Sequence, residues 1–414
     1  MSRLLMLGLA MAILWTCPTP AAAEDSVLTL RDALSRALAS NPDVHAARLR
    51  LEGARAWAEG AGALPNPELR LSGTSGDAGE DSNALIQRLE IAGQPGLRGR
   101  QARAEAQARQ HELEQVCREV VRRTGAAYYG SWEASRRRDV AEERLRLAEE
   151  LEKSSLRRLE LGDISRNEHL RIELETARAQ ADLAEAGGEE GAARVRLNLL
   201  LGREAGAALT LPEDPGSPTD GPGPEPGTEI LEERLLARPD LEALRARARA
   251  ASLEAELAGR AGAPDLEFSA YRSRLFSRGT EQGIQLSLVV PLWDWGTLGA
   301  AESRLRREAE ASRADLEAGV LRARSESESD RQLLLAARAR LEVLAGQLER
   351  FRKLSEMARR GYEAGLLSFV EVLDTQQAFR QALLDHLSAQ ATWHLARLDL
   401  HLSSGGGLSA EEIP

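Results

Sequence analysis

Apolar residues near the start of the chain recur at the three- and four-residue spacing of an amphipathic helix, from Leu30 to Ala63. Asn41-Pro42 interrupts this pattern, and proline either opens a helix or ends one. We therefore expect two helices, the second running from about Pro42 to Ala63. The period then changes to two on either side of a Gly/Asp/Ser-rich loop, which predicts a β-hairpin at about 67–92.

A second β-hairpin is predicted at about 265–292, and its alternation is clearer. The residues expected on one face are apolar: Leu266, Phe268 and Ala270 in the first strand, and Ile284, Leu286, Leu288 and Val290 in the second. Each strand has about the 9–11 residues of a tilted membrane strand. Trp293 and Trp295 follow directly, as an interfacial aromatic girdle would.

Each hairpin is followed by a Pro/Gly corner, 94–96 or 291–296, and then by a proline-free helical stretch of roughly 65 residues, on the order of 100 Å long. Gly162 and Gly365 end these stretches, and a second helix returns from each. The sequence thus predicts two long helical hairpins, at about 97–201 and 297–403.

The chain repeats itself. Leu161-Gly162-Asp163-Ile164-Ser165 matches Ala364-Gly365-Leu366-Leu367-Ser368, and Asn41-Pro42-Asp43 matches Arg238-Pro239-Asp240. Two long copies favour a duplicated architecture with pseudo-twofold symmetry, because a solenoid needs several short repeats. We divide the chain into a first repeat (24–211), a Pro/Gly-rich connector (212–227), a second repeat (228–404) and a flexible tail (405–414).

The first 23 residues have the form of a secretory signal, with Arg3, an apolar run and Ala21-Ala22-Ala23 before Glu24. Cys17 lies in a poor lipoprotein box, because bulky residues precede it. Cys117 would be the only cysteine of the mature protein, so no intrachain disulfide is expected. A net charge of −11 disfavours a nucleic-acid partner. No other stretch is apolar enough for a membrane helix, so membrane insertion would use strands.

Four membrane strands cannot close a barrel, whereas three chains would supply twelve. The predicted fold is mainly α with a small membrane β-barrel: a homotrimer whose twelve-stranded barrel continues as an α-helical tube into the aqueous compartment. Long Arg/Glu-rich helices with a modest apolar seam suit a tube that is wet on both sides.

The ordered set of motifs resembles the TolC family of outer-membrane efflux proteins over essentially the whole mature chain. It comprises the signal, Leu-Thr-Leu at 28–30, Asn41-Pro42, Pro65-Asn66-Pro67-Glu68-Leu69, hairpin, rod, glycine tip and connector, and then the second copy ending in Tyr362-x-x-Gly365-x-x-Ser368-x-x-Glu371-Val372-Leu373-Asp374. Pro65 to Leu69 and Leu89-Glu90-Ile91-Ala92-Gly93 look most like the CzcC-type branch, although Gln94-Pro95 stands where that branch often has a basic residue.

This resemblance implies a homotrimeric exit duct, with its twelve-stranded barrel in outer-membrane lipid and its α-helical tunnel in the periplasm. The duct would pass substrates, heavy-metal cations in the CzcC-type branch, from an inner-membrane pump of the resistance-nodulation-division type. A periplasmic adaptor would connect the two. Other channels of the family serve multidrug or type I secretion systems. A soluble periplasmic coiled-coil scaffold or pump adaptor is the alternative of another class, although an adaptor would need flanking lipoyl-like or barrel domains.

Enzymatic motifs are missing, and no cofactor is expected. His386, His394 and His401 share one predicted helix, but their spacings of 8 and 7 residues put them about 12 Å apart, too far for one metal ion.

Two sets of residues near the tips are candidates for function. Glu371 and Asp374 lie one helical turn apart and match the acidic pair of the family's periplasmic constriction, where a threefold ring of carboxylates would favour cations. Tyr362 and Arg360 are candidates for bonds that hold the tip closed. The adaptor-docking tips comprise Gly162, Asp163, Ile164 and Ser165 and, in the second copy, Gly365, Leu366, Leu367 and Ser368, with Ile164, Leu366 and Leu367 expected to be exposed knobs. A plain alternative is that these residues only turn and cap the helices.

Overall fold

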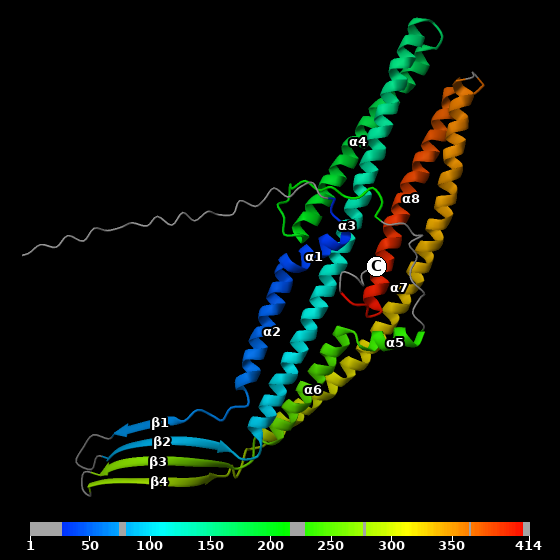
Figure 1. The fold of residues 1–414 in the computed structure, drawn as a ribbon. Coiled ribbons are helices and arrows are strands. Elements are labelled where there is room, and N and C mark those ends of the chain that lie inside the picture. Colours follow the sequence, from blue (N-terminus) through cyan, green and yellow to red (C-terminus); the bar gives the residue numbers. More distant parts are fainter. Residues whose placement is uncertain (1–26, 74–79, 216–227, 276–278, 364–365, 409–414) are drawn as a thin grey trace, which may run out of the picture.

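A computed structural model describes residues 27–73, 80–215, 228–275, 279–363 and 366–408. A four-stranded sheet lies at one end, and long helices run from it to two hairpin tips at the other end (Figure 1). The first half contains α1 (Leu30–Ser40), α2 (Pro42–Gly60), β1 (Glu68–Gly73), β2 (Glu80–Glu90), α3 (Gln94–Glu160) and α4 (Arg166–Leu200). The second half contains α5 (Thr228–Leu236), α6 (Pro239–Gly259), β3 (Asp265–Leu275), β4 (Gly279–Val289), α7 (Thr297–Glu363) and α8 (Phe369–Ser403).

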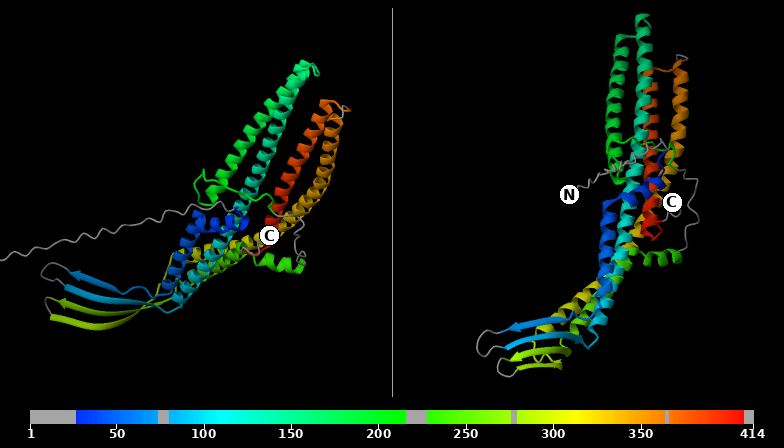
Figure 2. Two further views of the ribbon diagram at one scale, coloured as in Figure 1. Left: turned by 45° about the horizontal axis from the view of Figure 1, so that its top comes forward. Right: turned by 60° about the vertical axis from the view of Figure 1, so that its left-hand side comes forward.

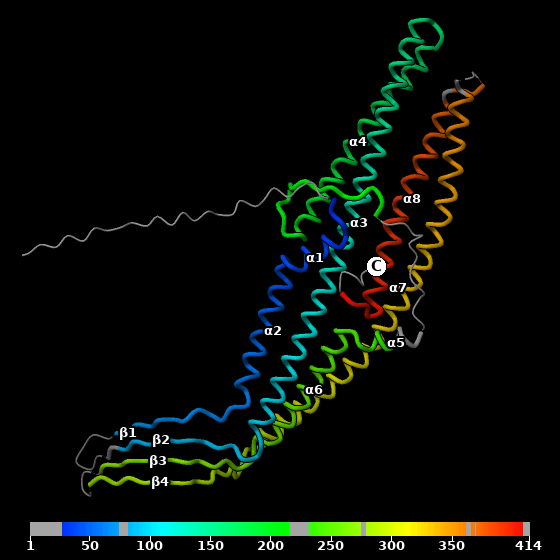
Figure 3. The backbone as a smooth tube through the Cα atoms, viewed as in Figure 1, coloured from blue at the N-terminus to red at the C-terminus, as the bar shows by residue number. Residues whose placement is uncertain are grey.

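The two helical hairpins have matching lengths. Helices α3 and α7 each have 67 residues, and α4 and α8 each have 35. Residue 94 corresponds to 297 and residue 166 to 369, so one shift of 203 positions relates both pairs of helices. Figure 3 shows α3 and α7 as unbroken helices from the sheet to the tips. The structure therefore carries the repeat of the sequence into three dimensions.

Local sequence explains where the helices begin. Helix α1 ends and α2 begins at Asn41-Pro42, where the Asn41 Oδ1 atom accepts a hydrogen bond from the Asp43 N–H at 2.8 Å. Pro95 lies in the first turn of α3, where a missing N–H costs nothing, and Gly93 makes the preceding bend with φ +80°. The residues at 94–96, predicted to form a corner, are therefore the first turn of α3.

All four strands are antiparallel and follow the order β1-β2-β3-β4. Their register aligns apolar residues across the sheet: Leu69, Leu85, Ala270 and Ile284 form one row, and Phe268 pairs with Leu286 in the next. This apolar face is open, with Ile284 73% exposed, whereas Ser269 on the opposite face is only 8% exposed. A globular protein would bury the apolar face instead.

Helices α6 and α8 each pack against both α3 and α7, while α2 and α4 pack chiefly against α3. The views of Figure 2 show the two hairpins side by side and the sheet bent away from the helix axes. Gly125 of α3 allows close packing of α8, because a Cβ atom there would collide with Leu398. The protomer is thus asymmetric: α6 and α8 are flanked on two sides, and α2 and α4 on one.

The main hydrophobic core lies at mid-height, where α1 crosses α3 (Figure 1). Tyr128 and Trp132 of α3 are almost fully buried there, and the Tyr128 hydroxyl donates a hydrogen bond to the Leu28 carbonyl at 3.1 Å. Burial raises the pKa of the neighbouring Tyr129 to about 12. This core joins the N-terminal segment, α3 and α8.

The chain after α8 is packed as far as Leu408, and residues 409–414 lie outside the described part. His401 Nε2 lies 2.9 Å from the Gly407 carbonyl oxygen, and Arg118 donates to the Gly406 carbonyl at 2.7 Å. The flexible tail was expected to begin at 405. The anchored chain extends further because Gly405 fits against Arg234 of α5 and Gly406 fits against the His401 ring.

Candidate functional site: the hairpin tips and the helix joint

A capping box forms the second tip. Ser368 is the N-cap of α8, and its hydroxyl oxygen accepts a hydrogen bond from the Glu371 N–H at 3.4 Å. In return, the Glu371 carboxylate accepts from the Ser368 N–H at 2.7 Å and from its hydroxyl at 2.9 Å. The backbone hydrogen bond, followed by the hydroxyl bond, lowers the pKa of Glu371. The Glu371 carboxylate is therefore held in its charged form, and it caps α8 of its own chain.

Asp374 is exposed on α8, one helical turn after the capping residue Glu371. The first copy differs here, because the same shift of 203 positions places Glu168 opposite Glu371 but Arg171 opposite Asp374. Only the α7–α8 hairpin therefore carries the acidic pair. Arg360 is exposed near the end of α7, whereas the side chain of Tyr362 lies outside the described residues.

The exposed apolar side chains at the tips differ from those expected. Leu366 is 81% exposed and Leu161 is 77% exposed, while Ile164 and Leu367 are half-buried. Leu367 is turned inward because it packs on Gly361, where a Cβ atom would lie 2.8 Å from its Cδ1 atom. The expectation for Leu367 and Ile164 is thus wrong, and Leu161 is a knob that the sequence reasoning missed.

Gly162 makes the first tip with φ +82°, and its N–H donates to the Leu159 carbonyl at 3.0 Å. The following Asp163 N–H donates to the Arg158 carbonyl at 2.9 Å, which closes the end of α3. Ser165 then caps α4 by accepting from the Glu168 N–H at 3.2 Å. Gly365, the counterpart of Gly162, lies outside the described residues.

The core of the first hairpin is more polar than that of the second. Ser155 is buried, and its hydroxyl lies 2.8 Å from His169 Nδ1. Their counterparts at a shift of 203 are Ala358 and Val372, both buried. The two tips therefore have related but chemically different interiors.

A groove with a cavity of about 450 Å³ separates the two hairpins behind the tips. Its walls combine aliphatic with charged side chains: Arg144 donates to Glu175 at 2.6 Å, and Arg380 enters from α8. Burial, followed by repulsion from Arg144, lowers the pKa of Arg380.

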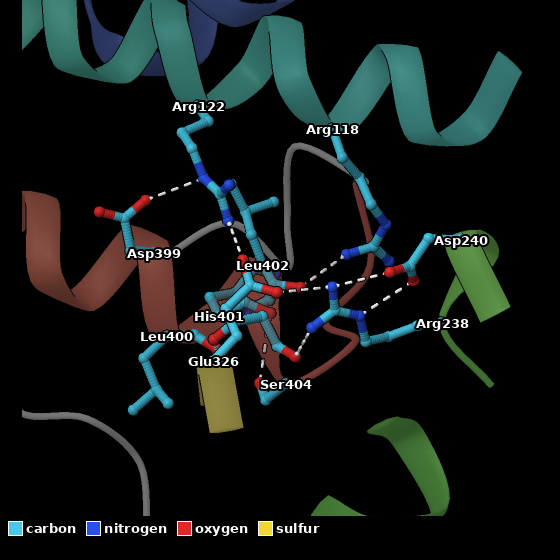
Figure 4. Close-up of polar contacts among 11 residues, drawn as sticks. Arg118, Arg122, Arg238, Asp240, Glu326, Asp399, Leu400, His401, Leu402 and Ser404 are labelled. Atoms are coloured by element: carbon cyan, nitrogen blue, oxygen red, sulfur yellow. Dashed lines mark hydrogen bonds and ion pairs between the residues drawn. The ribbon is translucent and has the colours of Figure 1, made fainter. Parts of the chain in front are cut away.

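Figure 4 shows an arginine cluster where the end of α8 meets the start of α6. Arg118 donates to the Leu402 carbonyl at 3.1 Å, and Arg238 donates to the Ser403 carbonyl at 2.8 Å. These carbonyls end a helix and lack intrahelical partners, so cations are favoured there. The pKa of Arg118 is lowered by burial and next by the charge of Arg238.

Carboxylates from three helices complete this joint (Figure 4). Arg238 binds Asp240 at 2.9 Å and Glu326 at 2.8 Å, and Arg122 lies 3.1 Å from Asp399. Sequence reasoning did not assign these residues a role. The available signal was Arg238-Pro239-Asp240, in which arginine replaces the Asn41 of the first copy.

Trp293 and Trp295 lie in the turn between β4 and α7 and are 70% and 90% exposed. Asp294 between them accepts hydrogen bonds from the Gly296 and Leu298 N–H groups at 3.1 and 2.9 Å. These backbone hydrogen bonds lower the pKa of Asp294, and the bond from Gly296 has the largest effect. The turn thus holds both indole rings outside the helix.

The part of the chain that the structure describes contains no cluster of three or more potential metal ligands. His394 stacks on Tyr129 with ring centroids 4.8 Å apart, and His401 contacts the Gly407 carbonyl, so these two histidines do not converge. Among the described helices, none is both long and apolar enough to cross a membrane.

Comparison with known proteins identifies the architecture. The family model described as outer membrane efflux protein matches residues 33–203 and 230–406. The chain belongs to the outer membrane efflux protein family. The two matched segments coincide closely with the two repeats and cover most of the chain, which confirms the resemblance seen in the sequence. The protein is accordingly located in the outer membrane with a long periplasmic extension, and its family consists of efflux channels rather than enzymes.

Similar members of the outer membrane efflux protein family include the cobalt-zinc-cadmium resistance protein CzcC of Cupriavidus metallidurans, which is 26% identical over 93% of this chain and 95% of its own. The pyoverdine export outer membrane protein OpmQ of Pseudomonas putida is 26% identical over 45% of this chain and 41% of its own. Among solved structures, CusC has a TM-score of 0.78 at 20% identity and covers 92% of both chains. The open state of Neisseria gonorrhoeae MtrE has a TM-score of 0.78 at 21% identity over 92% and 90%.

Proposed function

We propose that the protein is the exit duct of a tripartite efflux pump: a homotrimer with a twelve-stranded barrel in the outer membrane and an α-helical tunnel in the periplasm. The observation that carries this proposal is the inverted polarity of the sheet. Ile284 and Leu286 are 73% and 66% exposed on one face, while Ser269 and Ser273 are 8% and 7% exposed on the other. Lipid outside and water inside would match that polarity.

The two edges of the sheet support closure by further copies. Strands β1 and β4 each pair on one side only, and unpaired backbone groups are costly in lipid. Four strands are fewer than the 8 of the smallest single-chain bacterial barrels, and three chains supply twelve. Trp293 and Trp295 would then lie at the membrane interface as a girdle. In the alternative of a soluble scaffold or adaptor, this apolar face would have to be buried against a partner protein.

For the cargo, we propose heavy-metal cations delivered by a resistance-nodulation-division pump and a periplasmic adaptor. Similarity to a cobalt-zinc-cadmium resistance protein over nearly the whole chain favours this cargo. The shorter match to a pyoverdine export protein favours the alternative of a channel for organic compounds or secretion. In either case the tunnel conducts and does not transform the substrate.

Glu371 and Asp374 would form the constriction, with six carboxylates contributed by three α8 helices. The capping box supports a charged Glu371, because its hydrogen bonds favour the carboxylate form. Arg360 and Tyr362 would bond the closed tip to its neighbours. The tips around Ser165 and Ser368, with Leu161 and Leu366 as knobs, would receive the adaptor hairpins.

The mass of the detergent-extracted protein and its function in cells test this proposal. The native mass should be that of three protomers, the protein should resist extraction by salt or high pH, and deletion of the gene should sensitise cells to cobalt, zinc or cadmium. A salt-extractable monomer or dimer would refute the duct. A trimer whose loss leaves metal tolerance unchanged but blocks export of an organic compound would refute only the proposed cargo.

A further inference from the structure

The helix packing of one chain leaves one contact without a counterpart. Helix α6 packs against α7 of its own repeat and also against α3, whereas α2, its counterpart, packs chiefly against α3 of its own repeat. In the same way α8 packs on α7 and α3, but α4 chiefly on α3. By pseudo-symmetry, a helix equivalent to α3 should lie on the open side of α2 and α4. The helix that corresponds to α3 is α7.

The correspondence between the repeats is fixed by contacts made in both. Gly62, just after the end of α2, lies against Gly99 of α3, and Gly259 at the end of α6 lies against Glu302 of α7. A shift of 197 positions takes residue 62 to 259, and the shift of 203 takes 99 to 302. The same two shifts therefore translate any contact between α3 and α6 into its expected counterpart between α7 and α2.

The α3–α6 contact contains one ion pair, which translates with its charges preserved. Arg247 of α6 binds Glu112 of α3, with Nη2 2.5 Å and Nε 3.0 Å from Oε1. Their counterparts are Arg50 on α2 and Asp315 on α7. Both are exposed, and within the described residues neither makes an ion pair or hydrogen bond.

The same face of α2 carries an apolar stripe. Leu49 is 53% exposed, while its counterpart Ala246 on α6 is 6% exposed. Trp57, two turns further along, is 65% exposed, and a Cβ atom at the intervening Gly53 would meet nothing within 4 Å. This stripe and Arg50 lie on one side of the helix, because at about 100° per residue the positions 49, 50, 53 and 57 fall within an arc of about 100°.

A second contact higher in the molecule translates in the same way. Arg118 of α3 holds the carbonyl of Leu402 at the end of α8, where Leu402 is 4% exposed. The counterparts are Leu321 on α7 and Leu199 at the end of α4, which are 66% and 76% exposed. The contact of Arg118 with Leu402 inside the chain thus corresponds to two exposed leucines, Leu321 and Leu199.

We propose that α7 of one protomer lies along α2 and α4 of the next, with Arg50 paired to Asp315 and Leu199 packed on Leu321. This interface rests on the proposed trimeric duct and specifies its seam. A second copy of the chain is the occupant because its α7 carries both the complementary charge, Asp315, and the matching Leu321, at the separation that the corresponding α3 residues have within one chain. The contact is head-to-tail and closes into a ring after three copies.

Crosslinking tests the pairing in full-length protein with Cys117→Ser. Arg50→Cys with Asp315→Cys, and separately Leu199→Cys with Leu321→Cys, are treated with a short bismaleimide, because a disulfide needs Cα atoms within about 7 Å. Both pairs should give covalent dimers and trimers. Glu112→Cys with Arg247→Cys should react without a change of oligomeric mass. Arg48→Cys with Asp315→Cys should not crosslink chains, because Arg48 faces Cys117 on α3.

Charge reversal gives an independent readout. Arg50→Asp or Asp315→Arg alone should lower the trimer fraction at limiting concentration by about fivefold or more, since three like-charged pairs replace three ion pairs, and the double variant should restore it. A trimer without these crosslinks or this restoration overturns the pairing and leaves the duct intact. A wild-type protein without trimers overturns both.

Discussion

The arginine joint provides a quantitative prediction. Arg238→Asn introduces the residue that occupies the equivalent position in the first copy, and it removes two hydrogen bonds to Asp240, one to Glu326 and one to the Ser403 carbonyl. The Arg238 side chain is 12% exposed, so the loss leaves charged partners at a poorly hydrated site. Charge-assisted bonds contribute about 1.5–3 kcal/mol each in such surroundings.

The sum of these hydrogen-bond contributions would overstate the loss of stability in Arg238→Asn. The carboxylates of Asp240 and Glu326 are 28% and 37% exposed, so water recovers part of the lost hydrogen bonding. We expect a net loss of about 2–4 kcal/mol, concentrated at the end of α8 and the start of α6.

Hydrogen exchange measured on peptides that cover 396–406 reports this loss directly. Protection should fall about 30-fold or more, since 1.4 kcal/mol is tenfold. Arg324→Asn is the matched control, because Arg324 binds Glu232 at 2.6 Å with both side chains more than half exposed. It should cost no more than about 0.5 kcal/mol. Equal effects of the two variants would refute the view that the joint is a buried clamp.

Three further predictions concern the tips. Reconstituted channels should be cation-selective and blocked by trivalent cations from the tip side, and Glu371→Ala with Asp374→Ala should abolish the block; an unchanged block would place the constriction elsewhere. Leu366→Asp or Leu161→Asp should leave the trimer intact but lower metal resistance and adaptor crosslinking, whereas Leu156→Asp, further from the tip, should have little effect. The folded pKa of Glu371 is depressed, so its capping contribution to stability is complete above the unfolded pKa of about 4.3 and is lost as pH falls through the folded pKa. Hydrogen-exchange protection of the first turn of α8 should therefore decrease in that acidic window in the wild type. It should not decrease there in Glu371→Gln.

Much of the architecture can be predicted from the sequence because its signals are local. Asn41-Pro42 divides two helices through the proline ring and the asparagine cap, and Gly162 ends α3 because glycine adopts the left-handed conformation readily. The alternation of Leu266, Phe268 and Ala270 assigns one face of a strand. The repeat itself fixed the correspondence of the two hairpins. Each of these inferences depends on residues within a few positions of one another.

Only the tertiary structure decided which tip residues are open and which are covered. Leu367 and Leu366 are adjacent in sequence and equally apolar, yet Leu367 packs on Gly361 while Leu366 is exposed. The contacts of the arginine joint also do not follow from local sequence, because Arg118 and Gly406 are 288 positions apart and meet only where α8 ends beside α3. Burial and ion pairing depend on distances between segments that local spacing does not encode. The same physics makes Asn41 a simple cap in one copy and Arg238 a clamp in the other.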